Sequence, residues 1–312
     1  MTEIRPLTEA DLPEAQRIIR VAFGTFLGAP DPERFWMDRD YAFGRFGAEH
    51  VVSIGAIESG RLAGTNFATR WGSFGFFGPL TVKPDLWNAN LGQRLVAAAC
   101  DAFDAWGLRH MGLFTFAQSA KHVWTYGKFG FNARFLTAIM TAPAKTGARS
   151  EWSRYSELPD SQRNQIVAQA RDLTNELYEG LDLGAEIRTT AARRLGDTVL
   201  VWDGASRLGA FAVCQWGPSS EAGEGLLYVK FAAARAGRDA ESRFALLLDA
   251  CGELAAKAGM VKVFAGVNLA REEAYRHMLA RGFRTQVQGV AMHRPNEPGF
   301  SRPGLFVLDD WR

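Results

Sequence analysis

The sequence has few cysteines, almost no excess of charge of either sign and no long apolar run. Its three cysteines, Cys100, Cys214 and Cys251, are odd in number and far apart, which argues against a disulfide framework and is typical of a reducing compartment. A net charge of +2 over 312 residues gives no electrostatic support for binding nucleic acid or an anionic membrane surface. No uninterrupted apolar run reaches the ~18 residues that a membrane helix needs, and the first residues lack a signal-peptide pattern. We therefore expect a cytoplasmic protein with no nucleic-acid or membrane partner.

Several motifs that carry known chemistry are also missing. The sequence contains no GxxxxGK[ST] phosphate loop, no Gly-x-Ser-x-Gly elbow and no HExxH zinc pair. Its five histidines lack the spacing of metal ligands, so we expect no metal site. Gly72, Gly75 and Gly78 have regular spacing but precede a predicted strand rather than a helix, which excludes a dinucleotide fingerprint.

What the chain does have is a globular composition and enough length for two domains. Apolar residues make up 47% of the chain and charged residues 22%, as in ordinary folded proteins. At ~150 residues per domain, 312 residues are expected to form two.

The most informative stretch is residues 80–107, which is predicted to form a strand, a loop and a helix. Pro84 ends the strand because it has no N–H to donate. Apolar residues then recur at helical spacing from Leu91 to Trp106, and Gly107 is suited to a left-handed cap. A loop that leads into a helix N-terminus presents free N–H groups and can bind an anion.

Two blocks of the sequence carry a resemblance to a known family. The first is the lead-in Val82-Lys83-Pro84 followed by the loop Trp87-Asn88-Ala89-Asn90-Leu91-Gly92. The second is Ser119 followed, seven residues later, by Tyr126-Gly127-Lys128-Phe129-Gly130-Phe131. Together they resemble the GNAT family of acyl-CoA-dependent N-acyltransferases, closely over about the first half of the chain. The family's loop has more glycines and an Arg or Gln where this chain has Trp87, but Asn is the non-glycine residue that best tolerates positive φ.

The resemblance implies a mixed α/β fold in which a splayed central sheet is flanked by helices. It also implies that the splayed strand pairs with the pantetheine amides of acetyl-CoA or another acyl-CoA, which is recognition by strand addition. The expected cofactor-binding residues are Leu80, Thr81, Val82, Trp87, Asn88, Ala89, Asn90, Leu91, Gly92, Gln93 and Ser119.

By the same resemblance, Tyr126 is the expected catalytic acid. A phenol has a pKa of ~10 and a thiol one of ~8.5, so the tyrosine keeps its proton at neutral pH and can give it to the departing thiolate. From spacing alone, a core residue of an amphipathic helix is the better explanation of Tyr126, and the match to the family position reverses that preference. No carboxylate on the strand from Phe74 to Val82 offers itself as a base for the amine.

The second half of the chain repeats the first. Residues 95–131 align without a gap on residues 247–283, because 247 − 95 and 283 − 131 are both 152. We therefore expect two tandem GNAT folds, at residues 1–145 and 151–312, joined by a linker at 143–150. The tandem copies can act as a pseudo-dimer, so a monomer is expected.

The two copies differ where the cofactor would bind. Opposite the loop at 87–92 the second copy has Asp239 and Glu241 and no glycine, and Met278 stands where the first has Tyr126. We expect the second copy to be catalytically silent, and to be structural or to shape the acceptor pocket.

The acceptor is the least defined part of the prediction. The segment from Phe23 to Gly47 is rich in glycine and aromatic residues, and Phe35, Trp36 and Tyr41 are the candidate substrate-binding residues. The alternative is a local mini-core over the edge of the sheet. If the segment forms a pocket, the acceptor is a small amine with an apolar body. The predicted function is transfer of an acetyl group from acetyl-CoA to such an amine; the alternative is a non-catalytic acyl-CoA-binding or interaction protein.

Overall fold

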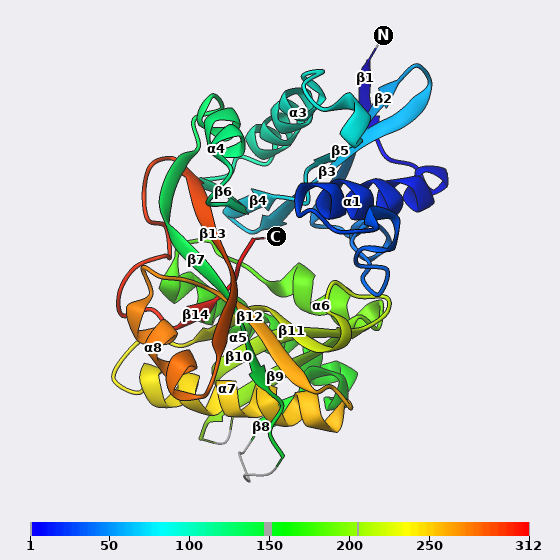
Figure 1. The fold of residues 1–312 in the computed structure, drawn as a ribbon. Coiled ribbons are helices and arrows are strands. Elements are labelled where there is room, and N and C mark those ends of the chain that lie inside the picture. Colours follow the sequence, from blue (N-terminus) through cyan, green and yellow to red (C-terminus); the bar gives the residue numbers. More distant parts are fainter. Residues whose placement is uncertain (1, 147–151, 205, 312) are drawn as a thin grey trace.

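The computed structural model describes residues 2–146, 152–204 and 206–311, and Figure 1 shows its fold. In chain order the strands are β1 (Glu3–Pro6), β2 (Val51–Glu58), β3 (Arg61–Trp71), β4 (Phe74–Phe77), β5 (Thr81–Val82), β6 (His110–Phe116), β7 (Asn132–Pro143), β8 (Trp152–Arg154), β9 (Gly196–Asp203), β10 (Arg207–Gly217), β11 (Gly223–Ala234), β12 (Lys262–Asn268), β13 (Arg284–Arg294) and β14 (Val307–Leu308). The helices are α1 (Leu12–Phe26), α2 (Ala42–Arg45), α3 (Leu91–Ala105), α4 (Ala120–Gly127), α5 (Asp160–Leu177), α6 (Gly184–Ala192), α7 (Ala240–Lys257) and α8 (Glu272–Ala280). Single 3-10 turns lie at Glu9–Asp11, Pro32–Arg34, Pro84–Leu86 and Tyr155–Glu157.

The strands form one sheet that runs through both halves of the molecule. Its order is β1-β2-β3-β4-β6-β13-β7-β12-β11-β10-β9-β8, with β5 paired to β3 and β14 to β11. This is the mixed, helix-flanked sheet that the sequence predicts. Helices α3 and α4 pack on one face of the first half, and α1 covers the opposite face. In the second half α7 lies on one face, and α5 and α6 lie on the other.

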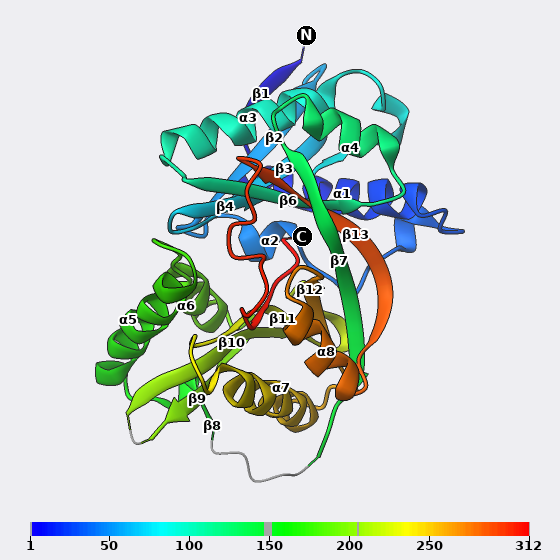
Figure 2. The same ribbon diagram turned by 90° about the vertical axis from the view of Figure 1, so that its left-hand side faces the viewer.

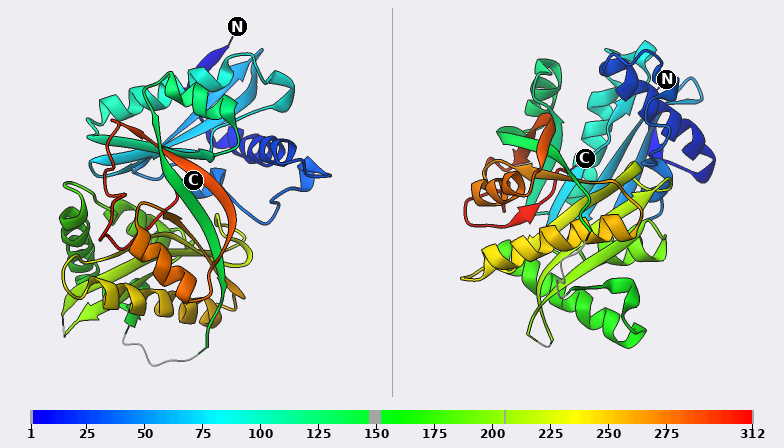
Figure 3. Two further views of the ribbon diagram at one scale, coloured as in Figure 1. Left: turned by 60° about the vertical axis from the view of Figure 1, so that its left-hand side comes forward. Right: turned by 60° about the horizontal axis from the view of Figure 1, so that its bottom comes forward.

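The two halves exchange their last strands. β13, from the end of the second half, lies between β6 and β7 of the first, while β7 pairs with β12 of the second. Figure 3 shows β7 and β13 side by side where the halves meet. Each half therefore completes its sheet with a strand from the other, and the two cores share that central pair.

Local predictions made from the sequence hold in this part of the fold. A hairpin forms between β2 and β3, with Ser59 and Gly60 at positive φ in its turn. The helix predicted from Leu91 begins at that residue and ends at Ala105. β7 pairs on both edges over most of its length. Most of the expected linker at 143–150 lies outside the described residues, so the domain boundaries stay a prediction.

Candidate active site

A slot opens in the sheet of the first half where β4 and β6 part. The two strands are parallel partners only from Phe74 to Phe76, opposite residues 110–112. Beyond that point the chain turns at Gly78 and continues as β5, which pairs with β3 and, within the described part of the chain, with no strand on its other side. The splay implied by the resemblance is therefore present, and it lies beside residues 80–82.

The backbone of Val82 faces this slot. The Lys83 N–H donates to the Ala63 carbonyl on β3 over 2.8 Å. Because successive residues of a strand point their N–H and C=O groups to opposite sides, those of Val82 turn away from β3 and toward the gap beside β6. A ligand with amide groups can pair with these backbone groups by strand addition.

Trp87 occupies part of the slot. Its indole N–H donates to the Val82 carbonyl over 2.9 Å, and its side chain is 37% exposed. The residue that replaces the family's usual Arg or Gln thus holds the carbonyl that a pantetheine amide would need. Thr81, by contrast, turns inward, where its buried hydroxyl hydrogen-bonds Thr65 over 2.9 Å.

The loop before α3 has the backbone conformation that the sequence predicts. Asn88 and Asn90 have φ of 75° and 60°, so each asparagine adopts the left-handed region where the family has glycine. Helix α3 begins at the next residue, and its first turn carries Gly92. A Cβ added at Gly92 would meet nothing within 4 Å. The helix N-terminus is therefore open to a ligand, and its free N–H groups favour a phosphate.

A cation that the sequence reasoning missed lies beside this loop. Lys121 of α4 donates to the Asn88 side-chain oxygen over 2.6 Å, so its ammonium group reaches from α4 to the loop before α3. Gln93 donates to the Asn90 side-chain oxygen over 3.1 Å, which ties the loop to the helix. Ser119 is the N-cap of α4 and accepts a hydrogen bond from the His122 N–H. Nothing in the spacing of Lys121 distinguished it from a solvated lysine.

Tyr126 lies in the wall of the slot. Its side chain is 7% exposed and packs edge-to-face on Phe77, with ring centroids 5.7 Å apart. Burial raises the pKa of Tyr126 well above its usual range, and a hydrogen bond with the Thr115 side chain opposes that shift. Thr115 is on β6 beyond the last rung shared with β4, so the phenol faces the splayed part of the sheet. The His122 ring contacts that of Phe26 in a tilted arrangement with centroids 5.1 Å apart, and burial lowers the pKa of His122.

The three aromatic residues expected at the acceptor site lie together. Trp36 contacts both Phe35 and Tyr41, with ring centroids 4.5 and 5.9 Å apart. Tyr41 is 4% exposed and belongs to the apolar cluster under α1, against which Trp36 is packed. These contacts support the mini-core alternative at Tyr41. Phe35 and Trp36 are half-buried, and their role at an acceptor pocket stays a prediction.

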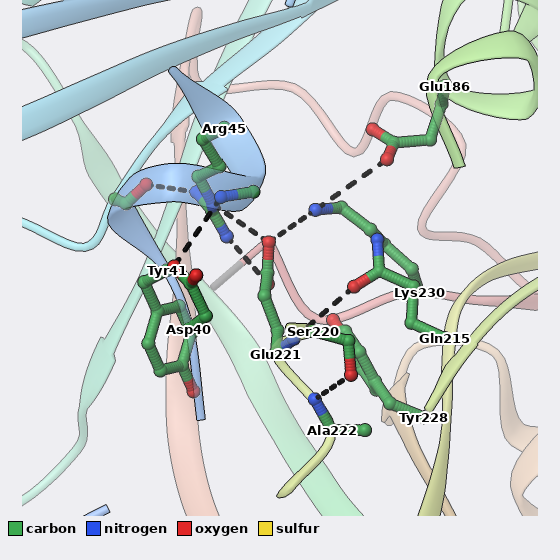
Figure 4. A network of polar contacts seen from close by, with 12 residues as sticks. Asp40, Tyr41, Arg45, Glu186, Gln215, Ser220, Glu221, Ala222, Tyr228 and Lys230 are labelled. Carbon is green, nitrogen blue, oxygen red and sulfur yellow. Dashed lines mark hydrogen bonds and ion pairs between the residues drawn. The ribbon is translucent and has the colours of Figure 1, made fainter. Parts of the chain in front are cut away.

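A buried ionic network links the slot to the second half (Figure 4). Arg45 of α2 forms two hydrogen bonds of 2.8 Å with the Glu221 carboxylate, and its third nitrogen donates to the Gly78 carbonyl. Lys230 donates to Glu221 over 2.7 Å and lies 3.7 Å from Glu186. All of these side chains are at most 6% exposed. The neighbouring cations lower the pKa of Glu221 against the opposing effect of burial, so both carboxylates are charged.

Several solved structures share this arrangement of both halves. One is a candidate acetyltransferase of Pyrococcus horikoshii, with a TM-score of 0.69 and 11% identity over 98% of this chain and 93% of that one. Another is a GCN5-related N-acetyltransferase of Sphaerobacter thermophilus, with a TM-score of 0.61 and 14% identity over 94% and 95%. A tandem GNAT protein from the clavulanic acid biosynthesis pathway has a TM-score of 0.57 and 12% identity over 94% and 98%. At such identities the likeness shows the fold, which is that of two tandem GNAT domains.

A sequence match to a family model covers most of the first half. Residues 15–131 match the model of the acetyltransferase (GNAT) family, from within α1 to the residue before β7. This part of the chain is similar to that family. The match supports acyl-CoA-dependent N-acyltransferase activity in general. No curated protein matches the sequence. In the described residues, no helix combines the length and apolarity needed to cross a membrane.

Proposed function

We propose that the first half transfers an acetyl group from acetyl-CoA to the primary amine of a small molecule. The observation that carries the proposal is the slot beside Val82, which lies next to an open helix N-terminus and a buried tyrosine. We further propose that the protein acts as a monomer in the cytoplasm, with the second half as a structural or acceptor-shaping copy.

The residues of the slot have separate tasks in this proposal. The backbone of Leu80 and Val82 pairs with the pantetheine arm, and the N–H groups around Asn90 and Gly92 hold the pyrophosphate. The cofactor supplies a thioester carbonyl, which the amine attacks as the carbon–sulfur bond breaks, and the proton that the nitrogen loses passes to solvent water. Tyr126 gives its proton to the departing thiolate, and burial of its ring keeps that proton in place until then.

The acceptor side of the proposal rests on the segment between α1 and β2. Its aromatic residues, Phe35 and Trp36 among them, supply apolar contact area, and its mixed charges offer no acidic groove for a basic peptide. A small amine with an apolar or aromatic body suits such a surface. If Trp36 contacts the acceptor, Trp36→Ala raises the acceptor KM and leaves acetyl-CoA affinity unchanged.

The experiment that tests the proposal compares the two copies at one matched position. Asn90 of the first copy corresponds to Ser242 of the second, because 242 − 90 is 152. Asn90→Asp puts a carboxylate where the pyrophosphate is expected and should weaken acetyl-CoA binding in calorimetry by roughly tenfold or more. Ser242→Asp, at an exposed site in the second copy, should leave it unchanged. Equal losses in both variants would place the binding site elsewhere.

Turnover separates the enzyme from its alternative, a non-catalytic acyl-CoA-binding module. Thiol release from acetyl-CoA, measured over a panel of small amines, should rise for amines with apolar bodies. Tight binding without release for any amine of a broad panel would support the binding module instead.

A further inference from the structure

The two copies can be compared residue by residue around their slots. The rung Phe74↔His110 of the first copy has its counterpart in Leu226↔Lys262 of the second. Both differences, 226 − 74 and 262 − 110, are 152, so the register of the strands confirms the repeat found in the sequence. By this offset residues 80–82 correspond to residues 232–234.

In the second copy the slot is filled by the chain's own C-terminal segment. β14 pairs in antiparallel fashion with β11 at Ala232↔Leu308 and Ala233↔Val307. The Ala234 N–H, equivalent to that of Val82, donates to the Phe306 carbonyl over 3.0 Å. Figure 2 shows the red C-terminal segment running between the two halves beside β11.

The segment also contacts the counterparts of the other expected cofactor-binding residues. Arg271, at the position of Ser119, is fully buried and donates to the Val307 carbonyl over 2.9 Å. Its guanidinium also pairs with the Asp309 carboxylate over 2.8 Å and 3.1 Å. An arginine in place of a small capping residue thus holds both the backbone and the acid of the C-terminal segment.

Apolar residues of the C-terminal segment also lie against the counterparts of Gly92 and Tyr126. Phe244 stands at the position of Gly92, and its ring packs on Phe306 with centroids 5.3 Å apart. Met278, at the position of Tyr126, lies in the same apolar cluster as Phe306 and Leu308. Where the first copy leaves open space over its helix N-terminus, the second has filled that space with two rings.

We propose that residues 305–311 are a built-in ligand of the second copy's slot, bound by strand addition in the place where the first copy takes a pantetheine arm. The slot of the second copy is a peptide site for an extended apolar segment followed by an aspartate. Because the C-terminal segment holds it, the chain offers one slot to acyl-CoA. The occupancy of the second slot does not depend on the activity of the first.

The test is hydrogen–deuterium exchange, resolved to single residues, on the full chain with and without saturating acetyl-CoA. In the free protein the Ala234 amide should exchange on the order of 100-fold more slowly than the Val82 amide, because one is bonded within the sheet and the other faces an open slot. Acetyl-CoA should slow Val82 and leave Ala234 unchanged. An Ala234 amide that exchanges as fast as Val82, or that acetyl-CoA slows, would overturn the proposal. A Val82 amide that acetyl-CoA does not slow would count against the proposed function alone.

A full-length variant tests whether the C-terminal segment causes this protection. Arg271→Met removes the buried anchor, and we expect the Ala234 amide to exchange at least ~10-fold faster while the Val213 amide in β10, a reporter of global unfolding, keeps its rate. The matched control is Arg276→Met in α8, the helix that Arg271 caps, where the arginine forms an exposed pair with Glu272. Faster exchange in both variants, or in neither, would contradict the proposal. The comparison within the wild-type chain stands even if Arg271→Met does not fold.

Discussion

At the scale of single residues, the environment of Tyr126 decides what it can do. Its phenol is 7% exposed and meets Thr115 on the slot-facing part of β6. Burial raises the pKa of Tyr126, so the group keeps its proton as the pH rises and does not become a base in the accessible range. The same apolar surroundings raise the proton affinity of a thiolate that forms beside the phenol, so Tyr126 can give up its proton there.

Tyr126→Phe should therefore lower turnover by about 10²-fold, the lower bound for a positioned acid, and leave acetyl-CoA affinity nearly unchanged. In the wild type, ionisation of Tyr126 should cause no fall in kcat up to pH ~10. Steady-state rates against pH, together with calorimetry, measure both. An unchanged rate in Tyr126→Phe when chemistry limits turnover would remove the residue from the mechanism.

A substitution at Trp87 should strengthen acetyl-CoA binding, whereas the substitution at Tyr126 should lower turnover. Its indole donates to the Val82 carbonyl over 2.9 Å, and that bond must break before a pantetheine amide can take its place. Trp87→Phe keeps the ring but removes the donor. Losing a competing hydrogen bond worth about 1 kcal/mol should tighten acetyl-CoA binding by roughly fivefold in calorimetry. Weaker binding would mean that the indole itself contacts the cofactor.

At the scale of elements, the buried network joins α2 of the first half to β11 of the second. Glu221→Gln leaves Arg45 and Lys230 buried with one carboxylate fewer to pair with. Removing one partner of a buried ion pair costs about 3–5 kcal/mol, so the free energy of unfolding measured in urea should fall by about that amount. The matched control is Glu224→Gln, three residues on and exposed, which should change stability by less than about 0.5 kcal/mol. Equal effects of the two substitutions would contradict the role given to the network.

The exchanged strands give a second prediction at this scale. Without the second half, β6 and β7 lose the strand that lies between them, and each exposes unpaired backbone groups. Residues 1–146 expressed alone should aggregate or stay unfolded, whereas co-expression with residues 152–312 should yield a soluble one-to-one complex. Size-exclusion chromatography and circular dichroism distinguish these outcomes. A monomeric, folded N-terminal half would show that it is an independent domain.

At the scale of the whole molecule, a pair of buried histidines makes stability depend on pH. His110 on β6 and His293 on β13 lie 2.9 Å apart between ring nitrogens and are at most 1% exposed. Burial lowers the pKa of His110 to about 4, and burial together with His110 lowers that of His293 to about 3. In the unfolded chain both have a pKa of ~6.5. Below that pH the unfolded state takes up protons that the native state does not.

Stability should therefore be complete above pH ~6.5 and should fall as the pH drops toward ~4, by at most about 1.4 kcal/mol per pH unit for each histidine. His293→Gln removes one of the two, so its free energy of unfolding should fall about half as steeply between pH 6.5 and 5. Urea titrations at several pH values measure both slopes. The same slope of the free energy of unfolding against pH in wild type and variant would show that other groups cause the loss of stability at acidic pH.

The sequence by itself determined the local structure of this protein and its internal repeat. The periodicity from Leu91 set the helix, and Asn88 and Asn90 adopted the left-handed backbone expected of them, because φ preferences and helical spacing act over a few residues. The offset of 152 reappears in the strand register for the same reason: equivalent residues make equivalent local structure.

Only the tertiary structure decided which strands and side chains meet across long distances in the chain. The exchange of β7 and β13, the contact of Lys121 with Asn88 and the C-terminal segment in the second slot join residues that are separated by at least 33 positions. Such contacts depend on how the sheet closes, and no periodicity or turn preference encodes them. Tyr41 illustrates the same limit. A tyrosine side chain can line a pocket or pack in a core, and in the fold Tyr41 lies in the apolar cluster under α1.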